Sequence, residues 1–418
     1  MTDAMRVTHI ITRLVLGGAQ ENTLATIRGL RQRSADGSSA SPLEINLISG
    51  STLGPEGSLE AEARKLFPLT RHSSLLTIVP ELIRPVHPLK DFIALRKLEK
   101  ILREQKPDLV HTHSGKAGIL GRLAAKRVGV PIIIHHIHGP SFGNFQGALA
   151  NFVFTAAERH AAKVTDHFFC SAAAMTKLYV AAGIGKPEMF TRIFSGFNLE
   201  PFLNATNDLA LRRQLGLDEK NFVIGKIGRI FKLKGHADLL RAFAKILPQI
   251  SHARLLFVGD GSLRGETESL AHELGVADKV IFTGLVPPAE VARYVGIMDC
   301  LAHLSYREAL SRALPQALAA GKPVIAYDFD GAEEVCRENE TGFLIRTGET
   351  ETAAKRLLQL AGDAALRKKF GNCGQSFVRE NFSVEKMVAD QYAVYQQLAT
   401  RHCLLPRPSE GRGWGEWA

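Results

Sequence analysis

Short apolar runs rich in β-branched and aromatic residues alternate with longer helical patterns along most of the chain. Such an alternation is typical of a parallel sheet that helices cover on both faces. The chain has 418 residues, too many for one ordinary core, and the alternation runs through it twice. The sequence therefore predicts an α/β protein with two doubly wound sheets.

The expected elements fall into two sets, one in each half of the chain. The N-terminal strands are Val7–Ile11, Ile45–Ile48, Leu109–Thr112, Pro131–Ile137 and His167–Cys170, and the helices are Ala19–Arg31, Leu89–Glu104, Ala117–Arg127 and Gly147–Lys163. The C-terminal strands are Phe222–Ile230, Arg254–Val258, Lys279–Thr283, Cys300–Leu304, Pro323–Tyr327 and Gly342–Ile345, and the helices are Lys234–Ile250, Leu263–Leu274, Pro288–Val295 and Leu314–Ala320. Two facing sheets leave a cleft at the carboxyl ends of their strands, where ligands of such sheets bind.

The periodicity breaks near residues 195–203, where Gly196, Asn198 and Pro201 fall. We therefore expect an N-terminal domain over residues 1–197 and a C-terminal domain over residues 198–382. Ser383 is a suitable N-cap for a closing helix over residues 383–400. The tail 401–418 has no period and is expected to be disordered.

The composition is that of a soluble globular protein, with 45% hydrophobic and 22% charged residues. No run of about 18 apolar residues predicts a spanning helix, and no apolar signal segment precedes the first strand. The five cysteines are scattered without C-x-x-C spacing. We therefore expect a cytoplasmic protein with reduced thiols, without a disulfide framework or zinc site.

The net charge of +10 is concentrated in the N-terminal half. Residues 1–200 hold 24 Lys and Arg against 16 Asp and Glu, whereas residues 201–418 hold 28 against 26. A basic half attracts anionic surfaces, but no nucleic-acid recognition motif accompanies it, so nucleic acid is not an expected partner. The segment Arg71–Lys106 fits either an anionic interface at the inner membrane face or a solvated helix face with a loop. Its apolar residues are Leu75, Leu76, Ile78, Val79, Leu82 and Ile83.

Glycines and cations mark two of the strand-to-helix loops. Gly17 and Gly18 follow the first strand, and they fit either a phosphate-binding loop or an ordinary turn. Gly228 and Arg229 end a later strand, and Lys234 opens the next helix. Both cations can point into one loop and clamp a pyrophosphate. Two solvent-exposed cations are the alternative.

The most informative segment starts at Glu308. Pro315 suits the first turn of a helix, so Glu308 lies in the preceding loop and Gln316 on the first helical turn. These two side chains could grip two hydroxyl-bearing rings of one ligand, and the amides of Leu310 and Ser311 would meet a phosphate between the rings. An ordinary amphipathic helix leaves Glu308 and Ser311 unexplained.

Two groups of residues could suggest a metal. Five histidines cluster at two neighbouring strand ends without a carboxylate or cysteine at ligand spacing, namely His111, His113, His135, His136 and His138. We expect His138, which precedes Gly139, to line the cleft instead. Asp328 and Asp330 lie between a buried strand and a glycine, which favours a turn with Asx capping. We therefore predict no metal site and no cofactor.

Over residues 5–400 the chain resembles the retaining GT-B glycosyltransferases of family four (glycosyl transferases group 1). The resemblance rests on four motifs in the right order. They are Gly17-Gly18 after the first strand, His138-Gly139 after a central strand, Gly228-Arg229 with Lys234-Gly235, and Glu308 through Ile325. The resemblance implies a GT-B fold, in which two Rossmann-like domains face a central cleft and the N-terminal domain takes the acceptor.

The resemblance also implies roles for individual residues. Glu308 would bind hydroxyls of the donor sugar, Arg229 and Lys234 would neutralise the leaving diphosphate, and His138 would line the sugar pocket. Gly17 and Gly18 would belong to the donor site with the segment Ala309-Leu310-Ser311, whose last two amides would hold phosphate oxygens. The charge of the two cations would make a metal unnecessary, and the acceptor would attack from the face that the leaving group occupies.

Three positions depart from the family pattern. Gln316 stands where a second glutamate grips the nucleotide ribose, and an amide loses the strength of a charge-assisted hydrogen bond. Ala309 replaces a usual glycine, and Gln20 replaces a frequent glutamate. These changes affect nucleotide preference more than the class of reaction.

The sequence favours a transferase that moves sugar from a nucleotide-diphosphate donor to a glycan or lipid-linked acceptor in surface polysaccharide or glycolipid synthesis. A GT-B phosphorylase or epimerase, and a catalytically silent nucleotide-sugar-binding protein, remain alternatives. The donor sugar, base and acceptor stay open.

Overall fold

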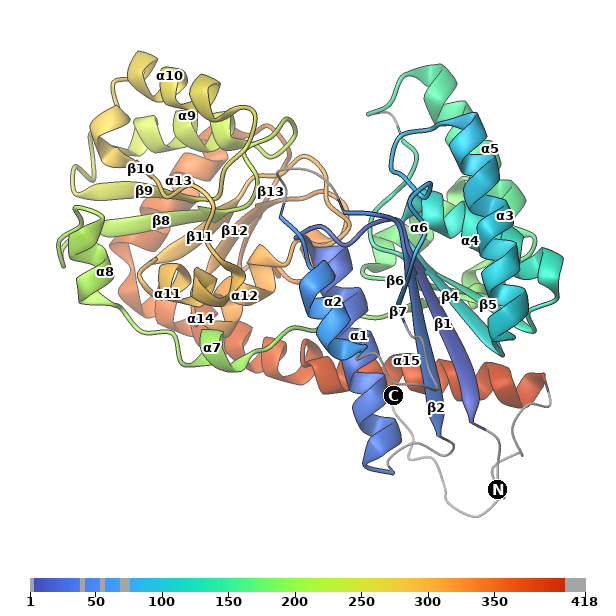
Figure 1. Cartoon of the computed structure of the whole chain (residues 1–418). Coiled ribbons are helices and arrows are strands. Elements are labelled where there is room, and N and C mark those ends of the chain that lie inside the picture. The colour runs from blue at the N-terminus through green and yellow to red at the C-terminus, as the bar shows by residue number, and fades with distance from the viewer. Residues whose placement is uncertain (1–3, 38–41, 53–56, 68–75, 144, 403–418) are drawn as a thin grey trace.

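Two parallel sheets lie side by side in the computed structural model, which describes residues 4–37, 42–52, 57–67, 76–143 and 145–402 (Figure 1). The first has the order β3-β2-β1-β4-β5-β6-β7 and the second the order β10-β9-β8-β11-β12-β13. In each sheet the strand order reverses beside the first strand, as in doubly wound folds. The predicted fold class is therefore confirmed, with two Rossmann-like units in one chain.

The central strands of the N-terminal sheet are almost entirely buried, and several of their buried side chains are polar. Its strands are β1 (Met5–Ile11), β2 (Leu43–Ser49), β3 (Leu76–Ile78), β4 (Leu109–His113), β5 (Ile132–Ile137), β6 (His167–Cys170) and β7 (Phe190–Arg192). The helices of this part are α1 (Gly18–Ala35), α2 (Glu60–Leu66), α3 (Pro88–Gln105), α4 (Gly115–Val128), α5 (Ala148–Ala162) and α6 (Ala173–Ala181). Helices α3 and α4 share one core with the sheet, and α1 shares another with it.

The C-terminal sheet follows the same plan. Its strands are β8 (Phe222–Ile227), β9 (Ala253–Val258), β10 (Val280–Phe282), β11 (Cys300–His303), β12 (Val324–Tyr327) and β13 (Gly342–Ile345). Its helices are α7 (Glu200–Leu203), α8 (Leu209–Gln214), α9 (His236–Ile246), α10 (Arg264–Glu273), α11 (Val291–Gly296), α12 (Ala313–Ala319), α13 (Thr350–Gly362) and α14 (Ala364–Asn381). Two buried clusters on opposite faces of the sheet form its core.

The closing helix crosses from the C-terminal to the N-terminal sheet. Helix α15 (Val384–Arg401) begins at Ser383, whose hydroxyl accepts the Lys386 amide, as the capping pattern predicted. Met387, Val388 and Tyr395 pack into the core that α1 shares with the N-terminal sheet. The boundary predicted at 197/198 falls between β7 and α7. Arg401 belongs to α15 and not to a disordered tail, whereas residues 403–418 lie outside the described residues.

Most predicted strands match within two residues, but helices α2, α6, α7, α8, α13 and α14 were not predicted, and three further details differ. The strand expected over Phe222–Ile230 ends at Ile227, because positive φ at Gly228 turns the chain away. The helix expected over Lys234–Ile250 begins only at His236. Two strands, β3 and β7, were not predicted; each has three residues and occupies an edge of the sheet.

Of the two interpretations of Arg71–Lys106, the anionic interface is wrong for part of the segment. Val79 and Leu82 are 1% and 0% exposed and belong to the core beneath α3 and α4. Leu76 and Ile78 lie in β3, while Leu75 falls outside the described residues. The strand-and-turn conformation of residues 76–82 directs the large side chains inward, which an amphipathic helix would not do.

No helix in the described part of the chain is long and apolar enough to cross a bilayer. The cysteines among the described residues, Cys170, Cys300, Cys336 and Cys373, are free thiols, and the first three are buried. Burial raises the pKa of each of these three thiols, which keeps them protonated at neutral pH.

Candidate functional site

Glu308 lies in the loop between β11 and α12, as the position of Pro315 predicted. Its carboxylate pairs with the ammonium group of Lys234, and His303 Nε2 lies 3.4 Å from the same carboxylate oxygen. Burial alone would raise the pKa of Glu308, but His303 and the charge of Lys234 outweigh it and lower the pKa to about 2. Glu308 is therefore an anion at physiological pH, with one face still reachable from solvent.

The Glu308 loop is tied to the loop that follows β12. The Glu308 amide donates to Asp330 Oδ2 at 2.8 Å, and the Gly331 amide donates to the Ala309 carbonyl at 3.1 Å. Asp330 follows a buried strand, as predicted, but its carboxylate caps a neighbouring loop and not its own turn. Asp330 has φ 52°, and any Cβ at Gly331 would collide with Ala172 of the N-terminal part and with the Ala309 carbonyl.

The amides of Leu310 and Ser311 have no hydrogen-bond acceptor among the described residues. They lie just before α12, on the wall of a small pocket that Glu308 and His303 also line. Gln316 lies on the first half of α12 and is half-buried, and its side chain likewise bonds to no described residue. This arrangement of a carboxylate, two free amides and a free side-chain amide agrees with the predicted positions.

Lys234 and Arg229 lie in the same loop but meet different partners. Lys234 contacts Glu308, two residues before α9, so it does not open the helix as predicted. Gly235, between Lys234 and α9, has φ 67°. A Cβ at this position would collide with the Leu304 carbonyl, so the loop requires glycine. Arg229 is exposed, with its guanidinium 5.0 Å from the ring centroid of Phe231.

Gly17 and Gly18 lie opposite the start of α12, across the gap between the two parts of the chain. A Cβ at Gly18 would lie 3.2 Å from Arg312 Cδ, and Arg312 pairs with Glu21 in the first turn of α1. The glycine turn thus lets α1 approach the segment that carries Leu310 and Ser311. The structure therefore places both glycines beside the predicted donor-binding segment.

His138 follows β5 and faces the same region from the N-terminal sheet. The Arg307 guanidinium donates to the carbonyl of Pro140, two residues after His138, at 2.7 Å. Ala309 and Leu310 pack with Ile137 in one buried cluster. These contacts bring the segment around His138 against the Glu308 loop, although His138 is not among the residues that line the small pocket beside Glu308.

Two family models match the chain and together span both sheets. The model described as "Glycosyl transferase 4-like domain" matches residues 17–191, and the model described as "Glycosyl transferases group 1" matches residues 207–377. The chain belongs to the group 1 glycosyltransferases.

Curated relatives share this enzyme class with the group 1 chain. The UDP-Gal:alpha-D-GlcNAc-diphosphoundecaprenol alpha-1,3-galactosyltransferase of Escherichia coli is 26% identical over 388 residues, which cover 92% of this chain and 95% of that protein. The capsular polysaccharide biosynthesis glycosyltransferase CapM of Staphylococcus aureus is 24% identical over 355 residues, which cover 82% and 89% of the two chains.

Solved structures show that the glycosyltransferase has the GT-B fold. Anabaena HepE, solved in complex with UDP, superposes with a TM-score of 0.77 at 22% identity, over 94% of this chain and 100% of that one. Sucrose-phosphate synthase from Thermosynechococcus elongatus gives a TM-score of 0.73 at 19% identity, over 95% and 100% of the two chains. These identities support the architecture alone.

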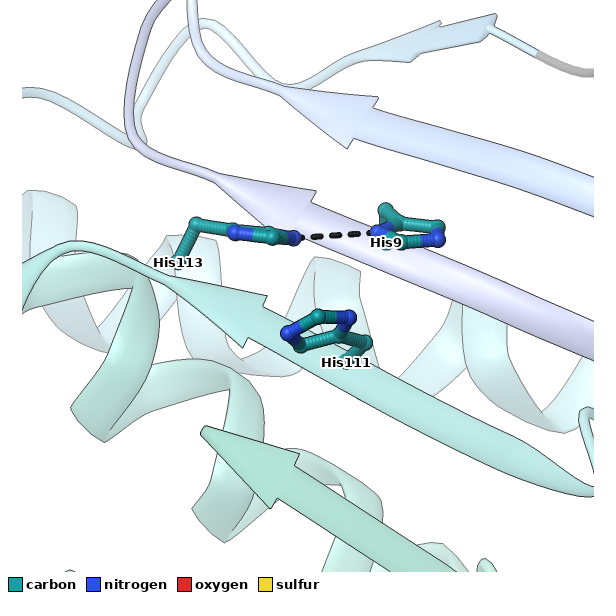
Figure 2. Close-up of side chains that lie close together, drawn as sticks. All are labelled: His9, His111 and His113. Atoms are coloured by element: carbon teal, nitrogen blue, oxygen red, sulfur yellow. Dashed lines mark hydrogen bonds between the residues drawn. The ribbon is translucent and has the colours of Figure 1, made fainter. Parts of the chain in front are cut away.

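Five histidines of the glycosyltransferase's N-terminal part form a connected network, of which His138 alone is half-buried and the rest are buried. Figure 2 shows three of them, His9, His111 and His113. His9 Nδ1 lies 3.0 Å from His113 Nε2, and His113 Nδ1 lies 3.0 Å from His138 Nε2. His136 stacks on His138 with 4.0 Å between the ring centroids, and His111 Nδ1 contacts the Tyr395 hydroxyl at 2.6 Å. Burial lowers the pKa of all five rings, which keeps them neutral.

Two sets of three rings have nitrogens within 4.8 Å of one another and could hold a metal. One set is His9, His111 and His113, and the other is His113, His136 and His138. Within these sets the rings stack or bond to one another, and no carboxylate belongs to either set. Four histidines of the predicted cluster lie in this network, which also includes His9. His135 points to the other face of the sheet, where its Nδ1 lies 3.0 Å from the Thr112 hydroxyl. The five rings fit a network of neutral imidazoles that ends at His138.

Several residues of the site escaped prediction. His303 ends β11 beside Glu308, and its place at the carboxyl end of a strand was an available signal. Arg307 and Arg312 act across the gap between the two sheets, so no signal within their own segment identifies them. Lys226 is buried in β8 without a hydrogen-bond partner for its ammonium group among the described residues.

Proposed function

We propose that the protein is a retaining glycosyltransferase that moves a sugar from a nucleotide-diphosphate donor to a glycan or lipid-linked acceptor. The observation that carries the proposal is the pairing of Glu308 with Lys234 beside the free amides of Leu310 and Ser311. A donor offers hydroxyls for the carboxylate and a diphosphate for the ammonium group and the amides. A bound donor would thus give hydrogen-bond partners to the two free amides and share the charges of Glu308 and Lys234.

In the proposed reaction, the bond between the anomeric carbon and the β-phosphate oxygen breaks, and a nucleoside diphosphate leaves. The acceptor hydroxyl oxygen bonds to the anomeric carbon on the same face, and its proton passes to the leaving diphosphate oxygen. Charge develops on the diphosphate and on the sugar ring, so fixed cations and hydroxyl-binding groups stabilise the transition state. Lys234 and Arg229 would serve the diphosphate, Glu308 the sugar hydroxyls, and His138 would line the sugar pocket.

We further propose that the reaction needs no metal ion. Lys234 and Arg229 supply positive charge in the loop where the diphosphate would lie. If so, transfer rates in excess EDTA will equal those in Mg²⁺ or Mn²⁺. A rate that collapses in EDTA and returns with one divalent ion would overturn this part.

The acceptor proposal draws on the relatives. The Escherichia coli relative is named for a diphosphoundecaprenol-linked sugar and the Staphylococcus aureus relative for capsular polysaccharide. We therefore place this enzyme in surface polysaccharide or glycolipid synthesis, in the cytoplasm at the inner face of the membrane. The basic N-terminal half supports an anionic surface as partner.

A donor screen with product analysis tests the proposal. The purified enzyme is given UDP-, GDP- and ADP-sugars with a lipid extract, and nucleoside diphosphate release and product stereochemistry are measured. We expect one nucleotide class to support transfer and the product to keep the donor's anomeric configuration. An inverted product would refute retention. Production of sugar 1-phosphate from glycan and inorganic phosphate would establish the phosphorylase alternative.

A further inference from the structure

Large apolar side chains are exposed on two helices of the N-terminal part. On and just before α3, Val86, Leu89 and Phe92 are 65%, 65% and 61% exposed. On α5, the corresponding set is Leu149, Phe152 and Val153 at 78%, 69% and 52%. We call these six side chains the α3/α5 surface. Isolated exposed leucines are ordinary, but a group of this kind marks a site of interaction.

Helix α5 is amphipathic with its large apolar face turned outward. Leu149, Phe152, Val153 and Ala156 recur at the spacing of one helical face and are exposed. The buried residues of the helix are Glu158 and two alanines, of which Glu158 pairs with Arg122 inside the domain. Packing within the domain explains Phe154, which lies against the buried cluster around Phe168, but not Leu149, Phe152 and Val153.

The two halves of the α3/α5 surface lie at the same end of one helical layer. The ammonium group of Lys116, at the start of α4, bonds to Asp91 in the first turn of α3 at 2.6 Å. On the other side of α4, a Cβ at Gly115 would lie 3.3 Å from Ser141 Cβ, and Ser141 belongs to the loop that leads into α5. Both helices begin at the upper end of the N-terminal part in Figure 1.

This surface is continuous with the proposed site. His138 follows β5, and only the short segment 139–147 separates it from the first turn of α5. Within that segment, Pro140 already contacts Arg307 of the C-terminal part. The loop that leads into α5 is therefore the same loop that contacts the C-terminal part beside Glu308.

The charges around the surface are cationic. Arg84 and Lys90 are exposed beside Val86 and Leu89, and neither makes an ion pair with a described residue. Among the described residues of 84–97 and 145–157, no carboxylate is exposed, since Asp91 is half-buried against Lys116. Apolar side chains within a cationic margin complement an anionic bilayer.

We propose that the α3/α5 surface docks on an anionic bilayer and that the acceptor reaches the cleft as a sugar carried on a lipid in that bilayer. The second statement rests on the proposed transferase function, whereas the first does not. The six apolar side chains enter the boundary between headgroups and acyl chains, and Arg84 and Lys90 contact the anionic headgroups.

Vesicle sedimentation tests the docking surface in the full-length protein. The vesicles contain equal parts of phosphatidylglycerol and phosphatidylcholine, with pure phosphatidylcholine for comparison. The double variants Leu89→Ser/Phe92→Ser and Leu149→Ser/Phe152→Ser are compared with Leu285→Ser, a leucine of the C-terminal part that is 72% exposed. Because each buried CH₂ favours the bilayer, we expect each double variant to lose binding at least about tenfold, and the control to change less than about twofold.

Two further measurements separate the possible failures. Unchanged melting and unchanged donor hydrolysis without vesicles establish that a variant is folded. Equal vesicle binding by wild type and both double variants would overturn the docking surface, as would a wild-type dimer that only these variants dissociate. Vesicle binding without transfer to any lipid extract would refute the transferase proposal and leave the docking surface in place.

Discussion

The carboxylate of Asp330 accepts the backbone amide of Glu308 at 2.8 Å, and this hydrogen bond joins the loops that follow β11 and β12. Burial raises the pKa of Asp330 to about 6, although the Glu308 amide and Arg307 oppose the rise. The pair fixes the backbone of the residue whose side chain meets Lys234. Asp330 is therefore a positioning residue for Glu308.

Replacing Asp330 should displace Glu308 without unfolding the protein. We expect Asp330→Ala to lower kcat/KM for the donor about tenfold, which corresponds to about 1.4 kcal/mol of transition-state stabilisation. Asp330→Asn keeps an acceptor oxygen and should recover part of that loss. Asp328→Ala, at an exposed neighbouring position, serves as the control. Full activity in Asp330→Ala would show that the loop holds its shape without this bond.

Lys234 and Arg229 are expected to act on the leaving diphosphate. Because that charge is greatest in the transition state, Lys234→Ala and Arg229→Ala should each lower kcat at least about tenfold. Lys232→Ala is the matched control, since Lys232 is exposed in the same loop and contacts no described acidic residue. Steady-state rates of nucleoside diphosphate release measure kcat in these variants. Near-normal rates in both variants would remove these residues from the diphosphate site.

The central strands and the Glu308 loop could be predicted because local chemistry determines them. The inner strands are buried apolar runs, and Pro315 fixes the start of a helix wherever that helix packs. Edge strands β3 and β7 have three residues each and only half-buried or exposed side chains, so their periodicity is too short to detect.

Contacts between the two sheets could not be predicted. Arg312 reaches Glu21, and Arg307 reaches Pro140, only because the sheets face each other at one particular distance. The incorrect assignment of residues 76–82 to a membrane interface has a similar cause. Residues 76–82 and residues 86–92 are both rich in apolar side chains, but only the packing beneath α3 decides that Val79 is buried and Phe92 exposed.

Gln316 marks the departure from the family pattern, and restoring a carboxylate there should tighten donor binding. A charge-assisted hydrogen bond is roughly twice as strong as a neutral one, so we expect Gln316→Glu to lower the KM for the donor about threefold to tenfold. Gln316→Leu cannot accept or donate and should raise the KM by a similar factor. Donor titrations at saturating acceptor measure both. An unchanged KM in the two variants would show that the nucleotide does not reach α12.

The buried histidines should make the N-terminal part sensitive to acid. Burial and the neighbouring rings lower the folded-state pKa of His136 well below the unfolded value of 6.5. The unfolded chain therefore binds more protons as the pH falls below about 6.5, and the free energy of unfolding falls by up to about 1.4 kcal/mol per pH unit for each histidine. Both ring nitrogens of His136 lack a described partner.

His136→Leu should remove one of the protons that the unfolded chain binds at acid pH. Urea unfolding at several pH values between 4 and 7 should give a shallower loss of stability in this variant, with His272→Leu, at an exposed position, as control. Identical pH slopes in wild type and His136→Leu would mean that His136 is not a neutral buried group in the folded protein.

Lys226 should destabilise the folded state at and below neutral pH. Burial, with a smaller contribution from Lys234, lowers its folded-state pKa from 10.5 to about 7. Between those two values the unfolded chain holds the proton that the folded chain has released, so stability rises with pH from about 7 towards 10.5. Below pH 7 the ammonium group is charged in both states, and the cost of burying it is fully present.

Lys226→Met keeps the length of the side chain and removes the charge. We expect this variant to be more stable than wild type by about 1 kcal/mol or more at pH 6, with a gain that shrinks as the pH approaches 10. Lys220→Met, at an exposed position near the start of β8, should leave the urea midpoint unchanged at both pH values. A gain that does not depend on pH would attribute the effect to packing, and a loss of stability at pH 6 would mean that the Lys226 ammonium group has an acceptor in solution.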